Sequence, residues 1–356
     1  MTTMTQPKMD TVYKSDFDLQ ASDMAVNYFQ EITNHPDKSW RGGVSFDGLD
    51  IGTSIDGLKK NPGFDWEVEA VPLHTAPSDG STRWMNSVGL RRKDNPMDQF
   101  GTTTKKFVIV QNHEAIDWFK PFFDSGLAMF ESAGTFKNGK RCWMMARMAG
   151  KPLFSLPDDP FLPYLLMTWG HDGRTALTIQ PVAYRLACAN QLPGLIKHGN
   201  EMGVKLKHRS GIDEAMKEVQ DITKQAYGGF KDMEATLQRL GKVPVNQKSL
   251  ENYFRRALKL PWRDPKALIL DNMKFEEQMD KVSYNLNHLF NCHEEERHTL
   301  PSSAHDTFNH ALNSVTRFAT HKQKAKDPST RFENNYFGPG AQLATRALKL
   351  AEEMAA

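Results

Sequence analysis

The spacing of hydrophobic residues changes once along the chain, near residue 210. Before this point, short apolar segments such as 65–73 and 83–92 alternate with polar residues and are separated by glycine, asparagine or proline. This pattern is typical of strands and turns. After it, apolar residues recur every three or four positions, beginning with Ile212, Met216 and Val219, as in amphipathic helices. The sequence therefore predicts an α+β fold, with an antiparallel, hairpin-rich sheet in the N-terminal half and a mainly helical C-terminal half.

Two segments predict hairpins. In 128–150, Asn138-Gly139 separates two extended runs, and this dipeptide is a strong two-residue turn signal. In 163–188, we expect a turn over His171–Arg174, because Gly173 accepts a positive φ and Asp172 can bond to the nearby backbone. Single strands are expected over 65–73, 83–92 and 105–112.

The helical pattern recurs in several segments. A short helix before Pro62 and Gly63 and a longer one over 112–126, capped by Asn112, are expected within the sheet half. Further helices are expected over 210–241, 249–260, 272–290, 306–322 and 340–355. This organisation predicts a mobile N-terminus over 1–20, an α+β sheet domain over 21–209 and a helical region over 210–356 packed on the sheet.

Composition narrows the class of protein. The 356 residues are 39% hydrophobic and 25% charged with a net charge of +2, an ordinary soluble composition. No apolar run approaches the roughly 20 residues of a membrane span, and the N-terminus lacks a secretory pattern. Three cysteines without a CxxC pair fit a reducing cytoplasm. Without a Walker loop or GxGxxG motif, an ATPase or Rossmann enzyme has no support, and no cofactor is expected.

Two segments contain residues that can bind metals. His171 and Asp172 form one pair, and the segment 292–298 supplies a cysteine, three glutamates and two histidines. However, His293 and His298 are five residues apart, which does not place them on one helix face. We therefore interpret 292–298 as a charged helix end that binds no metal. A metal-dependent enzyme is the less favoured hypothesis. Cys142 and Cys188 lack the context of a catalytic nucleophile.

Basic residues gather locally. The segment from Lys197 to Lys259 contains thirteen Lys and Arg but only eight Asp and Glu, and a second basic group lies over 317–331. Basic residues beside aromatics can follow a phosphate backbone while bases stack. A buried arginine at 185 would need a partner, for which Asp172 or a nearby acid is a candidate. The nucleic-acid-binding candidates are Lys137, Lys140, Arg141, Arg147, His171, Arg174, Arg185, Asn190, Lys205, Lys207, Arg209, Arg317, Lys322 and Lys324, and the base-stacking candidates are Phe136, Trp143 and Trp169.

Several segments resemble a family found mainly in bacteriophages and plasmids. The similar stretches include "FESAGTFKNGKRCWMMARM", "YLLMTWGHDGRTALTIQPVAYRLACANQL", "VKLKHRSGIDEAM" and "FGPGAQLATRAL". The family is described as phage/plasmid-like proteins, or as a domain of unknown function. Gln191 departs from its pattern, in which threonine is common. A relation to phage single-strand annealing proteins is a further expectation, because these also combine a curved antiparallel sheet, helices and a basic groove.

These observations predict a protein of phage-type DNA metabolism. It would bind single-stranded DNA without sequence specificity and assist annealing or recombination in the cytoplasm of a bacterial host, alongside phage or host replication and recombination proteins. A homo-oligomer is expected, because one subunit covers only a few nucleotides. Two alternatives stay open: a metal-dependent hydrolase or nuclease using His171, Asp172 and 292–298, and a non-catalytic inhibitor of a host factor.

Overall fold

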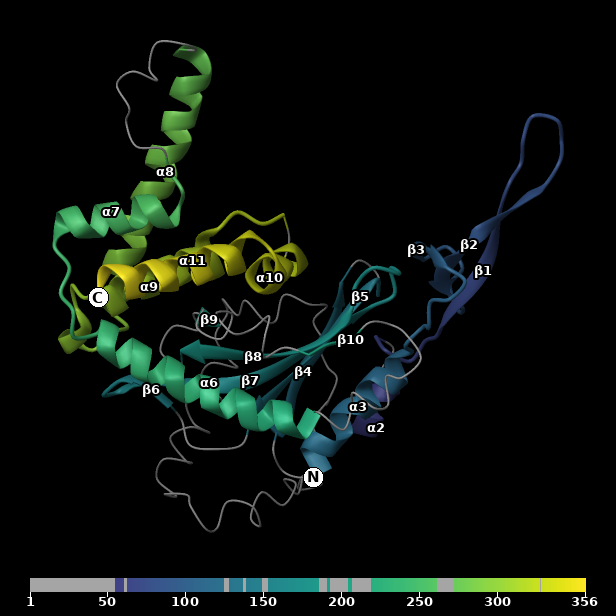
Figure 1. Cartoon of the computed structure of the whole chain (residues 1–356), viewed down its shortest axis with the longest axis horizontal. Coiled ribbons are helices and arrows are strands. Elements are labelled where there is room, and N and C mark those ends of the chain that lie inside the picture. Colours follow the sequence, from purple (N-terminus) through teal and green to yellow (C-terminus); the bar gives the residue numbers. More distant parts are fainter. Residues whose placement is uncertain are drawn as a thin grey trace, which may run out of the picture.

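A computed structural model of the protein shows strands mainly in the first half of the chain and helices in the second (Figure 1). This confirms the α+β expectation. The structure describes residues 55–60, 63–124, 128–136, 139–148, 153–185, 191–192, 204–206, 219–260, 272–326 and 328–356.

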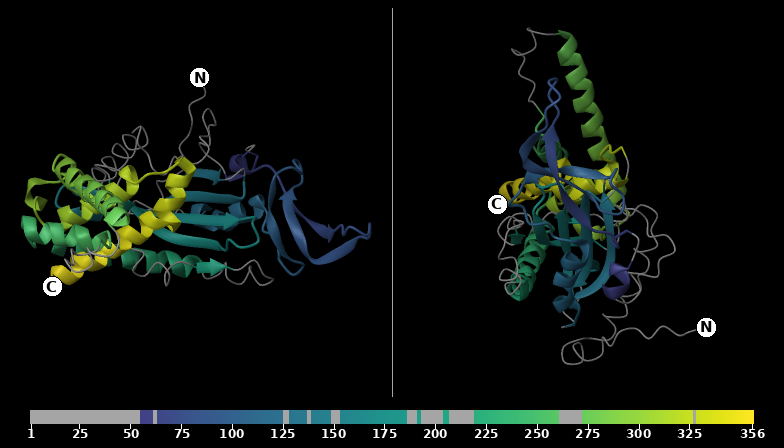
Figure 2. Two further views of the ribbon diagram at one scale, coloured as in Figure 1. Left: turned by 90° about the horizontal axis from the view of Figure 1, so that it is seen from above. Right: turned by 90° about the vertical axis from the view of Figure 1, so that its right-hand side faces the viewer.

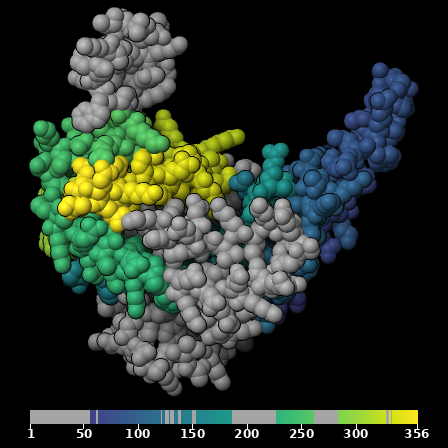
Figure 3. Space-filling view, in the orientation of Figure 1, coloured from purple at the N-terminus to yellow at the C-terminus, as the bar shows by residue number. Residues whose placement is uncertain are grey.

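A small antiparallel sheet lies at one end of the molecule. After the short helix α2 (Ile55–Lys59), its strands follow in the order β1 (Val68–Thr75), β2 (Arg83–Arg92) and β3 (Gln99–Thr104). The strands expected over 65–73 and 83–92 are thus confirmed. The distal part of the β1–β2 hairpin stands out from the body as an arm (Figure 3).

The strand expected over 105–112 is wrong. The described chain is irregular over 105–111 and enters α3 (Asn112–Asp124), while the preceding residues form β3. Val110 is buried, and Phe107 and Ile109 pack against the core. The apolar pattern therefore reports contact with the core, not backbone pairing.

The main sheet has the strand order β10-β8-β7-β5-β4, with β6 paired to β7 and β9 paired to β8. Both predicted hairpins are confirmed: β4 pairs with β5 up to Phe136 opposite Arg141, and β7 pairs with β8 up to Thr168 opposite Thr178. The strands are β4 (Ala128–Phe136), β5 (Arg141–Met148), β6 (Leu153–Leu156), β7 (Asp159–Gly170), β8 (Leu177–Arg185), β9 (Gln191–Leu192) and β10 (Val204–Leu206).

The helices of the C-terminal half gather at the end of the molecule opposite the small sheet (Figure 2). The expected helices are present in their described parts, whereas α10 was not predicted. The segment expected as one helix over 306–322 divides into α9 and a π-helical turn. The elements are α6 (Val219–Leu240), α7 (Gln247–Ala257), α8 (Asn272–Glu296), η4 (Ser302–Ala304), α9 (Phe308–Arg317), η5 (Phe318–Lys322), α10 (Pro328–Phe337) and α11 (Pro339–Met354).

One hydrophobic core joins the sheet and the helices. It includes Phe161 and Leu165 from β7, Leu237 from α6 and Leu312 from α9. Polar side chains enclosed between these layers must therefore find partners within the protein. In the described part of the chain, no helix has the length and apolar character needed to cross a membrane.

Candidate functional site

The β7–β8 turn is held together by Asp172. Its Oδ1 accepts hydrogen bonds from the backbone N–H groups of Arg174 at 2.9 Å and Thr175 at 2.6 Å. Gly173 has a φ of 73°, so the turn predicted from Asp172-Gly173 is confirmed. Burial alone would raise the pKa of Asp172, but the hydrogen bonds from Thr175 and Arg174 outweigh it, and the pKa is lowered. Asp172 thus acts as a structural carboxylate.

His171 is enclosed beside this turn. Its Nε2 lies 2.9 Å from Asn112 Oδ1, which also accepts a hydrogen bond from Trp169 Nε1 at 3.0 Å. The His171 ring meets Trp66 edge-on at 5.2 Å. His171 is only 1% exposed, so its expected position at a ligand-binding surface is corrected to one in the core.

The expected cap at Asn112 is also corrected. The Asn112 side chain turns inward, where its Nδ2 donates to the carbonyl of Phe64 at 3.2 Å. At the start of α3, Glu114 Oε2 accepts the backbone N–H of Gln111 at 2.8 Å instead. A glutamate near a helix N-terminus commonly serves this purpose.

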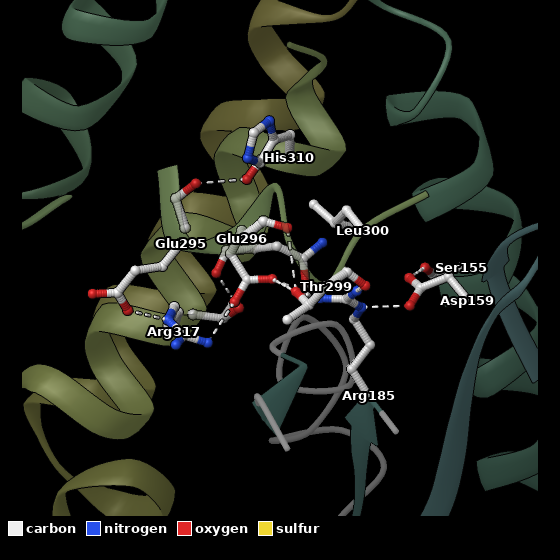
Figure 4. A network of polar contacts seen from close by, with 12 residues as sticks. Ser155, Asp159, Arg185, Glu295, Glu296, Thr299, Leu300, His310 and Arg317 are labelled. Carbon is white, nitrogen blue, oxygen red and sulfur yellow. Dashed lines mark hydrogen bonds and ion pairs between the residues drawn. The ribbon is translucent and has the colours of Figure 1, made fainter. Parts of the chain in front are cut away.

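Arg185 is the centre of a buried ion network (Figure 4). It is fully buried, and its Nε donates to Asp159 Oδ1 at 2.5 Å while Nη1 donates to Glu296 Oε2 at 2.7 Å. Arg317 Nη1 lies 3.2 Å from Glu296 Oε1. The expected acidic partner of a buried Arg185 is therefore present, but it is Asp159 together with Glu296 and not Asp172. The Arg185 side chain links β8 to β7 and α8 from a fully buried position. It therefore does not lie at a surface where it could contact DNA, contrary to the expectation.

The expected basic and aromatic contacts separate into several groups. Trp143 and Trp169 are 1% and 0% exposed. These two side chains are therefore buried in the core and do not offer the base-stacking surface that was expected. Arg147 is buried as well. Arg141 lies 3.3 Å from Glu333 and 3.7 Å from Asp172. Compensated charges of this kind leave less positive potential for an anionic ligand.

Other candidates lie nearer the surface or outside the described residues. Arg317 is paired with Glu295 and Glu296, and Lys322 lies 3.2 Å from Glu295. Arg174, Lys322 and Lys324 are exposed, and Lys140 is half-buried. The backbone of Phe136 lies in β4, and that of Lys205 lies in β10 opposite Thr178. Outside the described residues lie Lys137, Asn190, Lys207 and Arg209.

An exposed aromatic patch accompanies the second basic group. Tyr284 on α8 is 48% exposed, Lys324 Nζ lies 5.0 Å from the centre of its ring, and the His288 ring meets it edge-on at 4.3 Å. We call these three residues the Tyr284 patch. Lys322 and Lys326, on either side of Lys324 in the chain, are also exposed. The spacing of Tyr284 and His288, four residues apart on a helix, was the signal available in the sequence.

A histidine cluster lies between α8 and α9. The rings of His293 and His310 stack at 3.6 Å between centroids, and His293 Nε2 lies 3.6 Å from Asp306 Oδ1. Desolvation by burial lowers the pKa of both histidines to about 4, with Arg297 adding to the effect at His293 and His293 itself at His310. Both rings are therefore neutral at pH 7.

This cluster changes the expected metal chemistry. Among the described residues, His293, Asp306 and His310 form the group of potential ligands whose donor atoms lie within 4.8 Å of one another. His171 and Asp172 are engaged elsewhere, in the Asn112 contact and the β7–β8 turn. Among the described residues, the structure therefore does not support the alternative of a metal site shared by His171, Asp172 and 292–298. Asp306 and His310 were missed because they lie beyond the segment whose spacing was considered.

Comparison with known proteins identifies a family but no relative of established function. No curated protein and no solved structure matches the chain. Residues 99–336, more than half of the chain, match the family described as a domain of unknown function, DUF932. This span contains the main sheet, the Arg185 network and the Tyr284 patch. The protein is therefore a member of the DUF932 family.

Proposed function

We propose that the protein binds single-stranded DNA without sequence specificity, and that the Tyr284 patch forms part of the interface. The observation that carries the proposal is the placement of Lys324 over the exposed ring of Tyr284. An exposed aromatic ring offers a stacking surface to any base, and nearby cations attract the phosphates.

The charge around the patch supports an anionic ligand. Over residues 317–331, five Lys and Arg side chains accompany one aspartate, Asp327. Lys322 is partly compensated by Glu295. Lys324, which lies over Tyr284, and Lys326 are the other exposed lysines of this segment. We propose these two lysines as phosphate contacts and Tyr284 as the base-stacking residue.

The wider role rests on the resemblance described above. We propose that binding serves annealing or recombination in phage-type DNA metabolism, in the cytoplasm of a bacterial host and beside replication or recombination proteins. Self-association would extend the short contact of one subunit along the strand, because such proteins commonly bind cooperatively.

The test is a salt titration of binding to labelled single-stranded and double-stranded oligonucleotides. Tyr284→Ala should weaken single-strand binding by about fivefold to 150-fold, the range of about 1–3 kcal/mol for one stacked base, while Tyr284→Phe should retain most of it. Lys324→Ala should reduce the salt slope by about one. Lys349→Ala, which removes an exposed lysine from α11, is the matched control.

Two results would overturn the proposal. One is the absence of single-strand binding at about 50 mM salt, a condition that favours phosphate contacts. The other is binding in which Tyr284→Ala and Lys324→Ala behave like Lys349→Ala, which would place the interface away from the patch.

A further inference from the structure

We propose that His293, Asp306 and His310 form a binding site for a divalent transition-metal ion of the zinc class. Two imidazoles and a carboxylate are a ligand set that suits such ions. His293 comes from α8, His310 from α9, and Asp306 from the turn just before α9. The site is separate from the Tyr284 patch and does not depend on nucleic-acid binding.

The hydrogen bonds around the two rings determine which nitrogen carries a lone pair. Ser314 Oγ donates to the carbonyl of His310 at 2.7 Å, so it accepts from His293 Nδ1 at 2.9 Å. His310 Nε2 lies 2.7 Å from the carbonyl of His293 and donates to it. Because one nitrogen of each neutral ring carries the proton, His293 Nε2 and His310 Nδ1 present lone pairs. Metal-binding histidines are commonly oriented by such outer contacts.

These lone pairs are directed toward Asp306. His310 Nδ1 accepts the backbone N–H of Asp306 at 3.1 Å. His293 Nε2 is buried without a hydrogen-bond partner and lies 3.6 Å from Asp306 Oδ1. His293 Nε2 thus faces the Asp306 carboxylate across a short gap that a bound cation can bridge. A buried acceptor without a partner is costly, and a cation bound by both atoms would remove that cost.

Asp306 also provides access and local charge. Its side chain is 54% exposed, and its backbone φ of 55° is uncommon for a residue other than glycine. The carboxylate currently pairs with Arg297, whose guanidinium would compete with a metal ion. Arg297 is 31% exposed, so it can turn toward solvent when an ion binds.

Coordination by both histidines requires one local rearrangement. The donor atoms of the three residues lie within 4.8 Å of one another, but His310 Nδ1 accepts the backbone N–H of Asp306. An ion held by His293 Nε2 and Asp306 would therefore gain His310 Nδ1 as a third ligand when that one hydrogen bond opens. Three protein ligands leave at least one position for water on the exposed side of Asp306, as in open zinc sites.

Isothermal titration of the full chain with zinc tests the site. Wild type should bind one zinc ion per chain at this site, and Asp306→Asn should weaken the binding at least tenfold while asparagine tolerates the same backbone conformation. Arg297→Ala should strengthen it severalfold, because the competing cation is removed. His113→Ala, which removes an exposed histidine from α3, should leave it unchanged.

His293→Ala should abolish this binding, and circular dichroism will show whether the variant retains its fold. If that variant unfolds, the opposite effects of Asp306→Asn and Arg297→Ala still decide the question. Zinc binding that is absent in wild type, or equal in wild type, Asp306→Asn and Arg297→Ala, would overturn the proposal.

Discussion

At the scale of single residues, Asp172 shows how a short sequence can specify its own contacts. An aspartate before glycine favours a turn because its side chain reaches the backbone two and three residues later, and both bonds are present here. Asn112 shows the limit of this reasoning. Its position favoured a helix cap, but its amide instead meets Phe64, Trp169 and His171 from distant parts of the chain. The residues next to Asn112 in the sequence do not indicate which distant residues its side chain contacts in the fold.

Asp172→Ala should destabilise the protein at neutral pH by about 2 kcal/mol, because hydrogen bonds to a charged acceptor are lost. The carboxylate's folded pKa is lowered from 3.8, so its contribution is present above pH 3.8 and is lost as the pH falls through the lower folded value. In urea denaturation, the free energy of unfolding of the variant should therefore be well below that of wild type at pH 7, and this difference should become smaller at acidic pH. Asp65→Ala, at an exposed position, is the control. A difference independent of pH would contradict this account.

At the scale of elements, hairpins were predictable because turn and strands are neighbours in the sequence. The 128–150 and 163–188 segments contain their own turn signals and their own pairing partners. The strand over 105–112 failed for the opposite reason: alternating apolar residues show burial without showing which backbone, if any, lies alongside. The partners of β9 and β10, two short strands on β8, were invisible for the same reason.

Two glycine-to-alanine substitutions, one in a hairpin and one in a helix, should change the free energy of unfolding in opposite directions. Gly139 has a φ of 94°, and a Cβ there would lie 2.5 Å from Trp66, so Gly139→Ala should lower the free energy of unfolding by more than about 1 kcal/mol. A Cβ at Gly228 within α6 would meet nothing within 4 Å, so Gly228→Ala should raise it by about 0.8–1 kcal/mol. Thermal denaturation measures both. Changes of the same sign would refute the structural distinction between the hairpin glycine and the helical one.

At the scale of the whole molecule, the sheet and the helices depend on each other. They share one hydrophobic core, and Arg185 of β8 joins Asp159 of β7 to Glu296 of α8 across the boundary. The change of hydrophobic period near residue 210 predicted where the helical half begins, but it contained no information on this dependence. The buried ion pair between residues 185 and 296 could not be predicted, because any of many acidic residues could have met Arg185.

A chain ending at residue 260 should therefore fail to form the native sheet. It would lack Glu296 and the core residues of the later helices, such as Leu312 of α9, so apolar surface of the sheet would stay exposed to water. Near-ultraviolet circular dichroism should show loss of the fixed environments of Trp143 and Trp169, which are buried in the full chain. A chain lacking only Ala356 should retain the native spectrum. A native spectrum from the fragment would show that the sheet folds independently.

The separation of Arg185 from Glu296 by 111 residues has a consequence for biosynthesis. A ribosome adds about 5–20 residues per second, so Arg185 is made on the order of ten seconds before the residue that supplies its second carboxylate. During that interval β7 and β8 can pair, yet the surface that the C-terminal helices later cover is still open to solvent. Chaperones bind nascent chains whose apolar surface is exposed in this way. The hydrophobic core of this protein can therefore be completed only after the C-terminal helices have been translated.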